Sequence, residues 1–224
     1  MRRALIVVGK APIPGRTKTR LVPPLSADAA AALYRGLLLD TLQLAHSLGW
    51  ECISLVHPRG DAPLLRGLVP GVRLLEQPGE GLGPALRFAF ERHFRDGCDT
   101  VTLIGSDNPT LPVELVWDAQ DALAGGHDLS IGPSLDGGYY LIGMRQPHLG
   151  VFDHVDWSTS RVYAQTLERA ADLRLQVHAV QEWYDVDEPR DLERLLRELD
   201  GGPQAVAPHT RAALGEAMRV VRAV

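Results

Sequence analysis

The residues that could do chemistry begin with a glycine- and proline-rich segment, GKAPIPGRTKTRL at 9–21, which follows an apolar run. Its candidate phosphate-binding residues are Gly9, Lys10, Gly15, Arg16, Lys18 and Arg20. Glycine lets a backbone approach a phosphate closely, while lysine and arginine supply positive charge and hydrogen bonds to its oxygens. The segment matches neither a Walker A motif nor G-x-G-x-x-G. We therefore expect a phosphate-binding loop of another type; the alternative is a solvated loop whose cations aid solubility.

Two aspartates follow apolar runs elsewhere in the chain, Asp107 in GSDNPTLP and Asp187 in YDVDEPRDL. A carboxylate at the end of a central strand is well placed to hold Mg²⁺ or Mn²⁺ against a diphosphate. The alternatives are a turn or a helix cap. Asp185 alternates with Asp187, so in an extended chain the two side chains point to opposite sides. We expect only Asp187 to face the site.

A third candidate is Asp136, in the stretch DGGYYLIG at 136–143. The glycine pair could form a simple hairpin turn. The position of this stretch after a predicted strand favours the acceptor side of a site instead, with Asp136 as a base or a hydroxyl-binding group. No metal-ligand spacing is legible among the eight histidines.

The elements that must position these residues alternate along the chain. Apolar runs predict strands at 4–9, 51–57, 72–77, 99–107, 127–134, 137–144 and 174–181. Helical patterns lie between them, at 26–49, 61–68, 81–97, 112–126, 161–172 and 188–199, with Ser26 as a candidate N-cap. This alternation predicts an α/β fold with a mostly parallel sheet and helices on both faces. In such a sheet, ligands bind beyond the carboxyl ends of the strands, where the segments 9–21, 105–112 and 184–192 fall.

Composition sets the class of protein. The 224-residue chain is 45% hydrophobic with a formal net charge of −5, which suits one α/β domain and argues against a nucleic-acid or membrane-surface partner. The first apolar run is too short for a secretory signal, and no stretch approaches the roughly 20 apolar residues of a membrane span. We expect a cytoplasmic protein.

The combination of KAPIPGRTKTRL, GSDNPTL, PSLDGGYYLIG and DVDEPRDL resembles a bacterial family of GT-A-like glycosyltransferases or nucleotide-diphospho-sugar transferases, some of them associated with arsenosugar biosynthesis. The likeness extends from about Ala4 to Leu199. KTRL is similar to an element of phospholactate guanylyltransferases, and DVDEPRDL to the closing motif of CMP-sugar and molybdopterin nucleotidyltransferases. The resemblance implies that Asp107 and Asp187 are the metal-binding aspartates and that residues 9–20 bind a nucleotide. Typical GT-A glycosyltransferases carry Asp-x-Asp, whereas Ser106-Asp107-Asn108 is nearer to the nucleotidyltransferase pattern.

These observations and the resemblance together favour an enzyme that is a Mg²⁺- or Mn²⁺-dependent glycosyltransferase using a nucleotide-sugar donor and a small-molecule acceptor. The alternatives are a nucleotidyltransferase that uses an NTP and a catalytically silent nucleotide-binding protein. We expect residues 1–200 to form a nucleotide-diphospho-sugar transferase-like domain and 201–224 a helical tail packed on it, in a monomer or homodimer.

Overall fold

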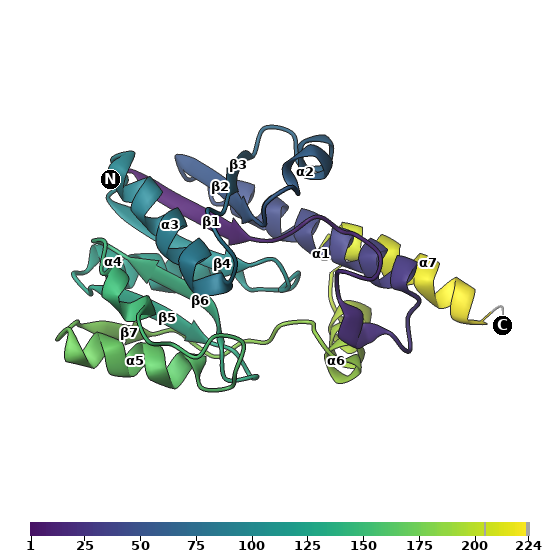
Figure 1. The fold of residues 1–224 in the computed structure, drawn as a ribbon. Helices are drawn as coiled ribbons and strands as arrows, with labels where there is room; N and C mark the ends of the chain where they lie inside the picture. Colours follow the sequence, from purple (N-terminus) through teal and green to yellow (C-terminus); the bar gives the residue numbers. More distant parts are fainter. Residues whose placement is uncertain (204, 223–224) are drawn as a thin grey trace.

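A seven-stranded sheet forms the centre of the computed structural model, which describes residues 1–203 and 205–222 (Figure 1). The strands are β1 (Arg3–Val8), β2 (Cys52–His57), β3 (Arg73–Glu76), β4 (Thr100–Gly105), β5 (Leu129–Pro133), β6 (Tyr139–Met144) and β7 (Val177–Ala179). Their order is β3-β2-β1-β4-β6-β5-β7. β6 is antiparallel to β4 and β5, and the other pairs are parallel. The predicted mostly parallel sheet is confirmed.

Helices cover both faces of this sheet (Figure 1). They are α1 (Ala27–Ser47), α2 (Ala62–Leu68), α3 (Leu82–Arg95), α4 (Val113–Ala124), α5 (Val162–Asp172), α6 (Pro189–Gly201) and α7 (Pro208–Arg222), with 3-10 turns η1 (Thr19–Leu21) and η2 (Leu149–Phe152). Side chains of α3, η2 and α5 pack on one face, and those of α1, α2 and α4 on the other. Because the central strands are buried on both faces, their sequences are nearly continuous apolar runs.

A third apolar cluster lies outside the sheet, where the first half of α1 projects toward α6 and α7 (Figure 1). The predicted cap is confirmed, since Ser26 accepts a hydrogen bond from the backbone of Ala29. α7 starts against α1, where the buried Asp40 carboxylate accepts the backbone N–H groups of His209 and Thr210 at 3.1 and 2.7 Å. This cluster of helices lies beyond the carboxyl edge of the sheet (Figure 1). The domain boundary at residue 200 stays a prediction.

The predicted strand at 174–181 is shorter in the structure, where β7 pairs with β5 only over three residues. Beyond it the chain from 180 to 188 is irregular apart from a single bridge between Ser134 and Trp183. In the part of the chain that the structure describes, no helix has the length and apolar character to cross a bilayer.

Candidate active site

A cleft of about 750 Å³ opens at the carboxyl ends of β1 and β4. The predicted site residues that line it are Lys10, Lys18, Arg20, Asp107, Asp136 and Asp187. The loop after β1, the β4 end, the β5–β6 turn and the segment before α6 thus meet in one place, as expected for an open α/β sheet. The other three predicted residues of the loop, Gly9, Gly15 and Arg16, do not line the cleft that the described part of the chain forms. Arg16 is largely exposed and approaches Asp61 at 4.0 Å.

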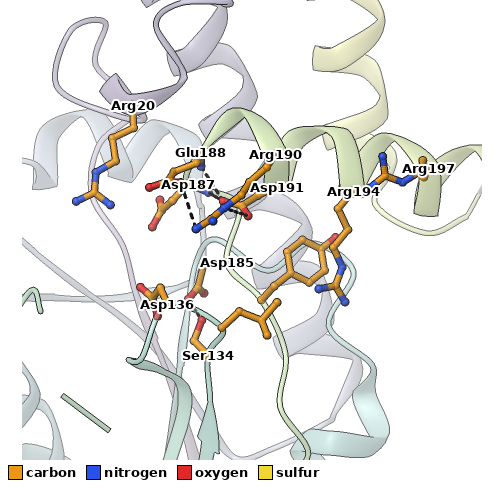
Figure 2. A pocket seen from close by; sticks show the side chains of 12 residues that line it. Arg20, Ser134, Asp136, Asp185, Asp187, Glu188, Arg190, Asp191, Arg194 and Arg197 are labelled. Carbon is orange, nitrogen blue, oxygen red and sulfur yellow. Dashed lines mark hydrogen bonds and ion pairs between the residues drawn. The ribbon is translucent and has the colours of Figure 1, made fainter. Parts of the chain in front are cut away.

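A smaller side pocket of about 330 Å³ adjoins the cleft and is walled by the start of α6 (Figure 2). Both hollows share seven residues, Arg20, Leu135, Asp136, Asp185, Asp187, Glu188 and Arg190. Ser134, Tyr184, Asp191, Arg194 and Arg197 line the side pocket alone. Arg190, Arg194 and Arg197 are not among the residues predicted from the sequence, although their spacing at i, i+4 and i+7 places them on one stripe of a helix.

The cationic loop is anchored at its start by buried polar groups. The Asp61 carboxylate accepts the backbone N–H of Ala11 at 2.7 Å, and the Tyr34 hydroxyl accepts that of Lys10 at 2.9 Å. The Tyr34 hydroxyl also lies 2.9 Å from the Ser106 hydroxyl, which joins the loop to the end of β4. Burial raises the pKa of Tyr34, so its hydroxyl stays neutral. These contacts hold the loop backbone, while the Lys10 side chain remains exposed beside the cleft.

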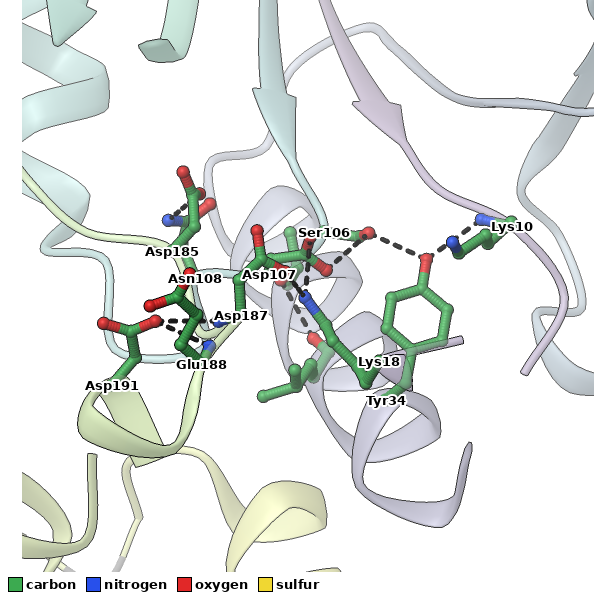
Figure 3. A network of polar contacts seen from close by, with 12 residues as sticks. Lys10, Lys18, Tyr34, Ser106, Asp107, Asn108, Asp185, Asp187, Glu188 and Asp191 are labelled. Atoms are coloured by element: carbon green, nitrogen blue, oxygen red, sulfur yellow. Dashed lines mark hydrogen bonds and ion pairs between the residues drawn. The ribbon is translucent and has the colours of Figure 1, made fainter. Parts of the chain in front are cut away.

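The Lys18 ammonium lies between the two predicted metal-binding aspartates (Figure 3). Its Nζ is 2.8 Å from Asp107 Oδ2 and 2.7 Å from Asp187 Oδ1. Burial alone would lower the pKa of Lys18, but the two carboxylates raise it above its ordinary value. Burial would likewise raise the pKa of Asp187, and Lys18 holds it below its ordinary value. Two carboxylates from distant segments therefore converge on one cation.

Lys18 reaches this position through an unusual backbone conformation. Its φ of 49° lies in the left-handed region, which is uncommon for a residue other than glycine. Gly15, earlier in the loop, has a φ of +73° in open space, where the conformation itself favours glycine. The loop therefore bends twice before η1, and the second bend directs the lysine inward.

Asp185 faces the cleft too, so the prediction that it points away is wrong. Its carboxylate accepts hydrogen bonds from Asn108 Nδ2 at 2.7 Å and from the Ser134 hydroxyl at 2.5 Å. Burial, together with the charges of Asp107 and Asp187, raises the pKa of Asp185 to about 6. Strand alternation did not apply because this segment is not part of a strand.

The other predicted role of Asp187, a helix cap, falls to its neighbour. Glu188 is the N-cap of α6. Asp191 Oδ2 accepts the backbone N–H groups of Glu188 and Asp187 at 2.8 and 3.1 Å. The carboxylate of Asp187 is thus available to the cleft, with its backbone held by the helix start.

The donor set suits a hard divalent cation. Asp107 and Asp187 already reach a single ammonium group, and carboxylate oxygens are the ligands that Mg²⁺ and Mn²⁺ prefer. No group of three or more His, Cys, Asp or Glu side chains within the described ranges is arranged to hold a metal by itself. This is compatible with Mg²⁺ chemistry, because Mg²⁺ commonly takes one or two carboxylates and completes its shell with phosphates and water.

Asp136 lies on the turn between β5 and β6, exposed at the junction of the cleft and the side pocket. Its Oδ1 accepts the backbone N–H of Gly138 at 2.9 Å. Gly137 packs so closely against Ser160 that a Cβ would lie 2.2 Å from the Ser160 carbonyl oxygen. This turn is thus fixed against the loop before α5, with the second carboxylate oxygen of Asp136 free to meet a ligand.

Several known proteins are similar to this chain in sequence or in structure. The family DUF2064, described as an uncharacterized protein conserved in bacteria, matches residues 40–159. The phosphoenolpyruvate guanylyltransferase of Sphaerobacter thermophilus is 30% identical over 183 residues, which are 80% of this chain and 86% of that protein. A crystal structure from Desulfovibrio desulfuricans G20, provisionally named a nucleotide-diphospho-sugar transferase, is 36% identical with a TM-score of 0.88 over 99% of this chain and 98% of that one.

A more distant structure is the manganese complex of Rv0371c from Mycobacterium tuberculosis H37Rv. It is 19% identical, with a TM-score of 0.55 over 88% of this chain and 99% of that chain. At this identity the likeness concerns the fold alone. The expected relationship to nucleotide-diphospho-sugar transferases and guanylyltransferases is confirmed.

Proposed function

The chain belongs to the bacterial family DUF2064, and from this premise we propose that it is a metal-dependent nucleotidyltransferase that uses a nucleoside triphosphate and releases pyrophosphate. The observation that carries the proposal is the convergence of Asp107 and Asp187 on one cation beside a cationic loop. The guanylyltransferase relative supports an NTP donor.

The geometry at the end of β4 favours nucleotidyl over glycosyl transfer. Asp107 is followed by Asn108, whose amide donates to the Tyr184 carbonyl at 2.6 Å and to Asp185. Asn108 is therefore held below the cleft through its amide nitrogen and supplies no second carboxylate. The second one comes from Asp187, close to the start of α6, which is the arrangement that the motif DVDEPRDL implies.

The transfer would require few groups from the protein. An acceptor oxygen attacks the α-phosphorus, the bond from that phosphorus to the bridging oxygen breaks, and pyrophosphate leaves with those electrons. Lys10, Lys18 and Arg20 would bind the phosphate oxygens, and positioning together with charge stabilisation would supply most of the acceleration. Asp136 would hold the acceptor hydroxyl and take its proton.

Asp107 and Asp187 would hold Mg²⁺ or Mn²⁺, which when bound supplies positive charge against the phosphates and the leaving group. In this proposal the three loop residues outside the cleft lining have indirect roles; they are Gly9, Gly15 and Arg16. Gly9 leaves room for Leu55 and Tyr34, and Gly15 allows the bend of the loop. Arg16, near the buried Asp61, would turn toward the donor's outer phosphate.

Glycosyl transfer from a nucleotide-sugar is the second candidate. It is favoured by the 36% identity, over nearly the whole chain, to the structure provisionally named a nucleotide-diphospho-sugar transferase. The two reactions share the cleft and the aspartate pair and differ in their products, which are pyrophosphate and a nucleoside diphosphate.

The test is a thermal-shift panel of NTPs and nucleotide-sugars with Mg²⁺ or Mn²⁺, since a ligand stabilises the folded state in proportion to the logarithm of its concentration over its Kd. Donors that bind are then assayed with small-molecule acceptors for pyrophosphate and for nucleoside diphosphate. Asp107→Asn should abolish metal-dependent turnover without unfolding the protein. The matched control is Asp121→Asn, which changes an exposed aspartate of α4. Stabilisation by no nucleotide, with or without metal, would refute the proposal.

A further inference from the structure

The side pocket differs from the cleft in the kind of side chain that forms its inner wall. Arg194 and Arg197 line the side pocket and are absent from the lining of the cleft. Arg20 and Arg190 line both hollows, and all four arginines are labelled in Figure 2. Four guanidinium groups thus surround a space of about 330 Å³, which is the size of a small-molecule site.

We propose that this pocket binds the anionic end of the acceptor, a carboxylate or a phosphate group. The inference rests on the proposed function for the transfer reaction and adds the chemical class of the second substrate. Guanidinium groups present planar donors that match carboxylate and phosphate oxygens, and a neutral ligand would leave them unused.

All the carboxylates that line the pocket except Asp136 are already engaged with other groups of the chain. Asp191 caps the backbone of α6 through two N–H groups. Asp187 is paired with Lys18, and Asp185 accepts hydrogen bonds from two neutral side chains. Glu188 pairs with Arg190 at 3.2 Å, and Asp136 keeps a carboxylate oxygen without a partner among the described residues.

Arg190 is paired with Glu188 and Asp191 at 3.2 and 3.8 Å, whereas the other three arginines retain free donors. Arg194 uses Nε for Glu198 at 3.2 Å and stacks its guanidinium 3.9 Å from the ring centroid of Tyr184. Its Nη atoms make no hydrogen bond to any residue that the structure describes. Within the same described ranges, Arg20 and Arg197 have no carboxylate within 4.0 Å. The stacked Arg194 is held in a defined orientation by this aromatic contact, which reduces the entropy lost when it binds an anion.

The position of the pocket suits an acceptor. It shares Asp136 and Asp187 with the cleft, so a molecule held at its anionic end by Arg194 would extend toward the phosphates of a donor. A hydroxyl or acidic oxygen at its other end would then meet the carboxylate of Asp136. The arginine wall would thus select acceptors that carry charge at one end.

The experiment titrates the full chain with inorganic phosphate, malonate or neutral glycerol at constant ionic strength. Binding is followed by calorimetry and thermal shift, with and without an α,β-methylene NTP and Mg²⁺ in the cleft. We expect saturable binding of phosphate, malonate or both, and none of glycerol. Arg194→Met and Arg197→Met should each weaken anion binding at least fivefold and leave the affinity for the nucleotide unchanged. Arg35→Met, at an exposed position of α1, is the matched control.

The outcomes separate the two proposals. A response to phosphate alone assigns a phosphate group, and a response to malonate alone assigns a carboxylate. Anion binding that is absent from the wild type, or equally strong in both variants, would overturn the inference even if the nucleotide binds. Missing nucleotide binding would instead overturn the proposed function, and the titration without nucleotide still decides the pocket. Should Arg194→Met fail to fold, the exposed Arg197→Met decides.

Discussion

Replacing Lys18 with methionine tests the relation between its ammonium and the metal that Asp107 and Asp187 are expected to hold. The Lys18 side chain is 4% exposed, and its Nζ contacts both carboxylates. Methionine keeps an apolar stem of similar length and removes the charge. The variant leaves two carboxylates facing each other without a cation between them.

The loss of stability in this variant depends on how deeply Lys18, Asp107 and Asp187 are buried. Removing one member of a buried ion pair typically costs about 3–5 kcal/mol. Asp107 and Asp187 keep 29% and 39% of their side-chain surface exposed, so water would solvate part of the uncovered charge. We expect a loss of about 2–3 kcal/mol without divalent metal, which corresponds to a fall in Tm of about 4–12 °C for a chain of this length.

The free energy that the folded protein loses without Lys18 should reappear as tighter binding of a metal ion to the two carboxylates. In the wild type, Mn²⁺ must displace the ammonium, whereas in Lys18→Met the carboxylates are free. Since about 1.4 kcal/mol is a factor of ten, Mn²⁺ should bind the nucleotide-free variant roughly 30-fold to 140-fold more tightly. Electron paramagnetic resonance of free Mn²⁺ measures this affinity directly, and Mg²⁺ should restore the Tm of the variant.

Lys10→Met is the matched control, because it removes an exposed lysine of the same loop. Its Tm and its Mn²⁺ affinity should remain close to those of the wild type. If Lys18→Met bound Mn²⁺ no more tightly than the wild type, the idea that lysine and metal compete for the aspartate pair would be refuted.

Three further predictions concern other parts of the molecule. Gly36→Ala would place a Cβ 2.9 Å from the backbone at the start of α7, so its Tm should fall by the equivalent of about 1–3 kcal/mol; Gly67→Ala, in open space on α2, should be neutral or gain up to about 1 kcal/mol. A fall of equal size in both glycine variants would contradict the close packing of α7 on α1. Burial lowers the pKa of His93 below its ordinary 6.5. Just below that pH, the unfolded chain therefore binds a proton at His93 that the folded chain does not bind. Stability should therefore fall as the pH drops below 6.5, by up to about 1.4 kcal/mol per pH unit. His93→Gln should remove that slope in urea unfolding, and His154→Asn, at an exposed position, should keep it. Arg20→Ala should weaken nucleotide binding by about 1.5–3 kcal/mol in calorimetry, as expected for a lost charge-assisted hydrogen bond, and an unchanged affinity would remove Arg20 from the phosphate site.

The class of fold, and the edge of the sheet that carries the candidate site, follow from the sequence alone. Strands such as Arg3–Val8 and Thr100–Gly105 can be predicted from the sequence, because a strand that is buried on both faces consists of a nearly unbroken apolar run. The cap at Ser26 is legible because an N-cap depends on local hydrogen bonds to the next turn. The segments at the strand ends could be expected to meet because parallel strands present their carboxyl ends at one edge.

Which side chains meet inside that site was decided only by the tertiary structure. Asp185 turns into the cleft because its segment lies outside any ladder, so alternation places no constraint on it. Lys18 lies between Asp107 and Asp187 because the loop enters a left-handed conformation at that residue, and local sequence does not specify which residue of a loop does so. The arginines of α6 line a pocket because an apolar cluster packs that helix against α1, and a contact between segments so far apart in the chain has no local signal.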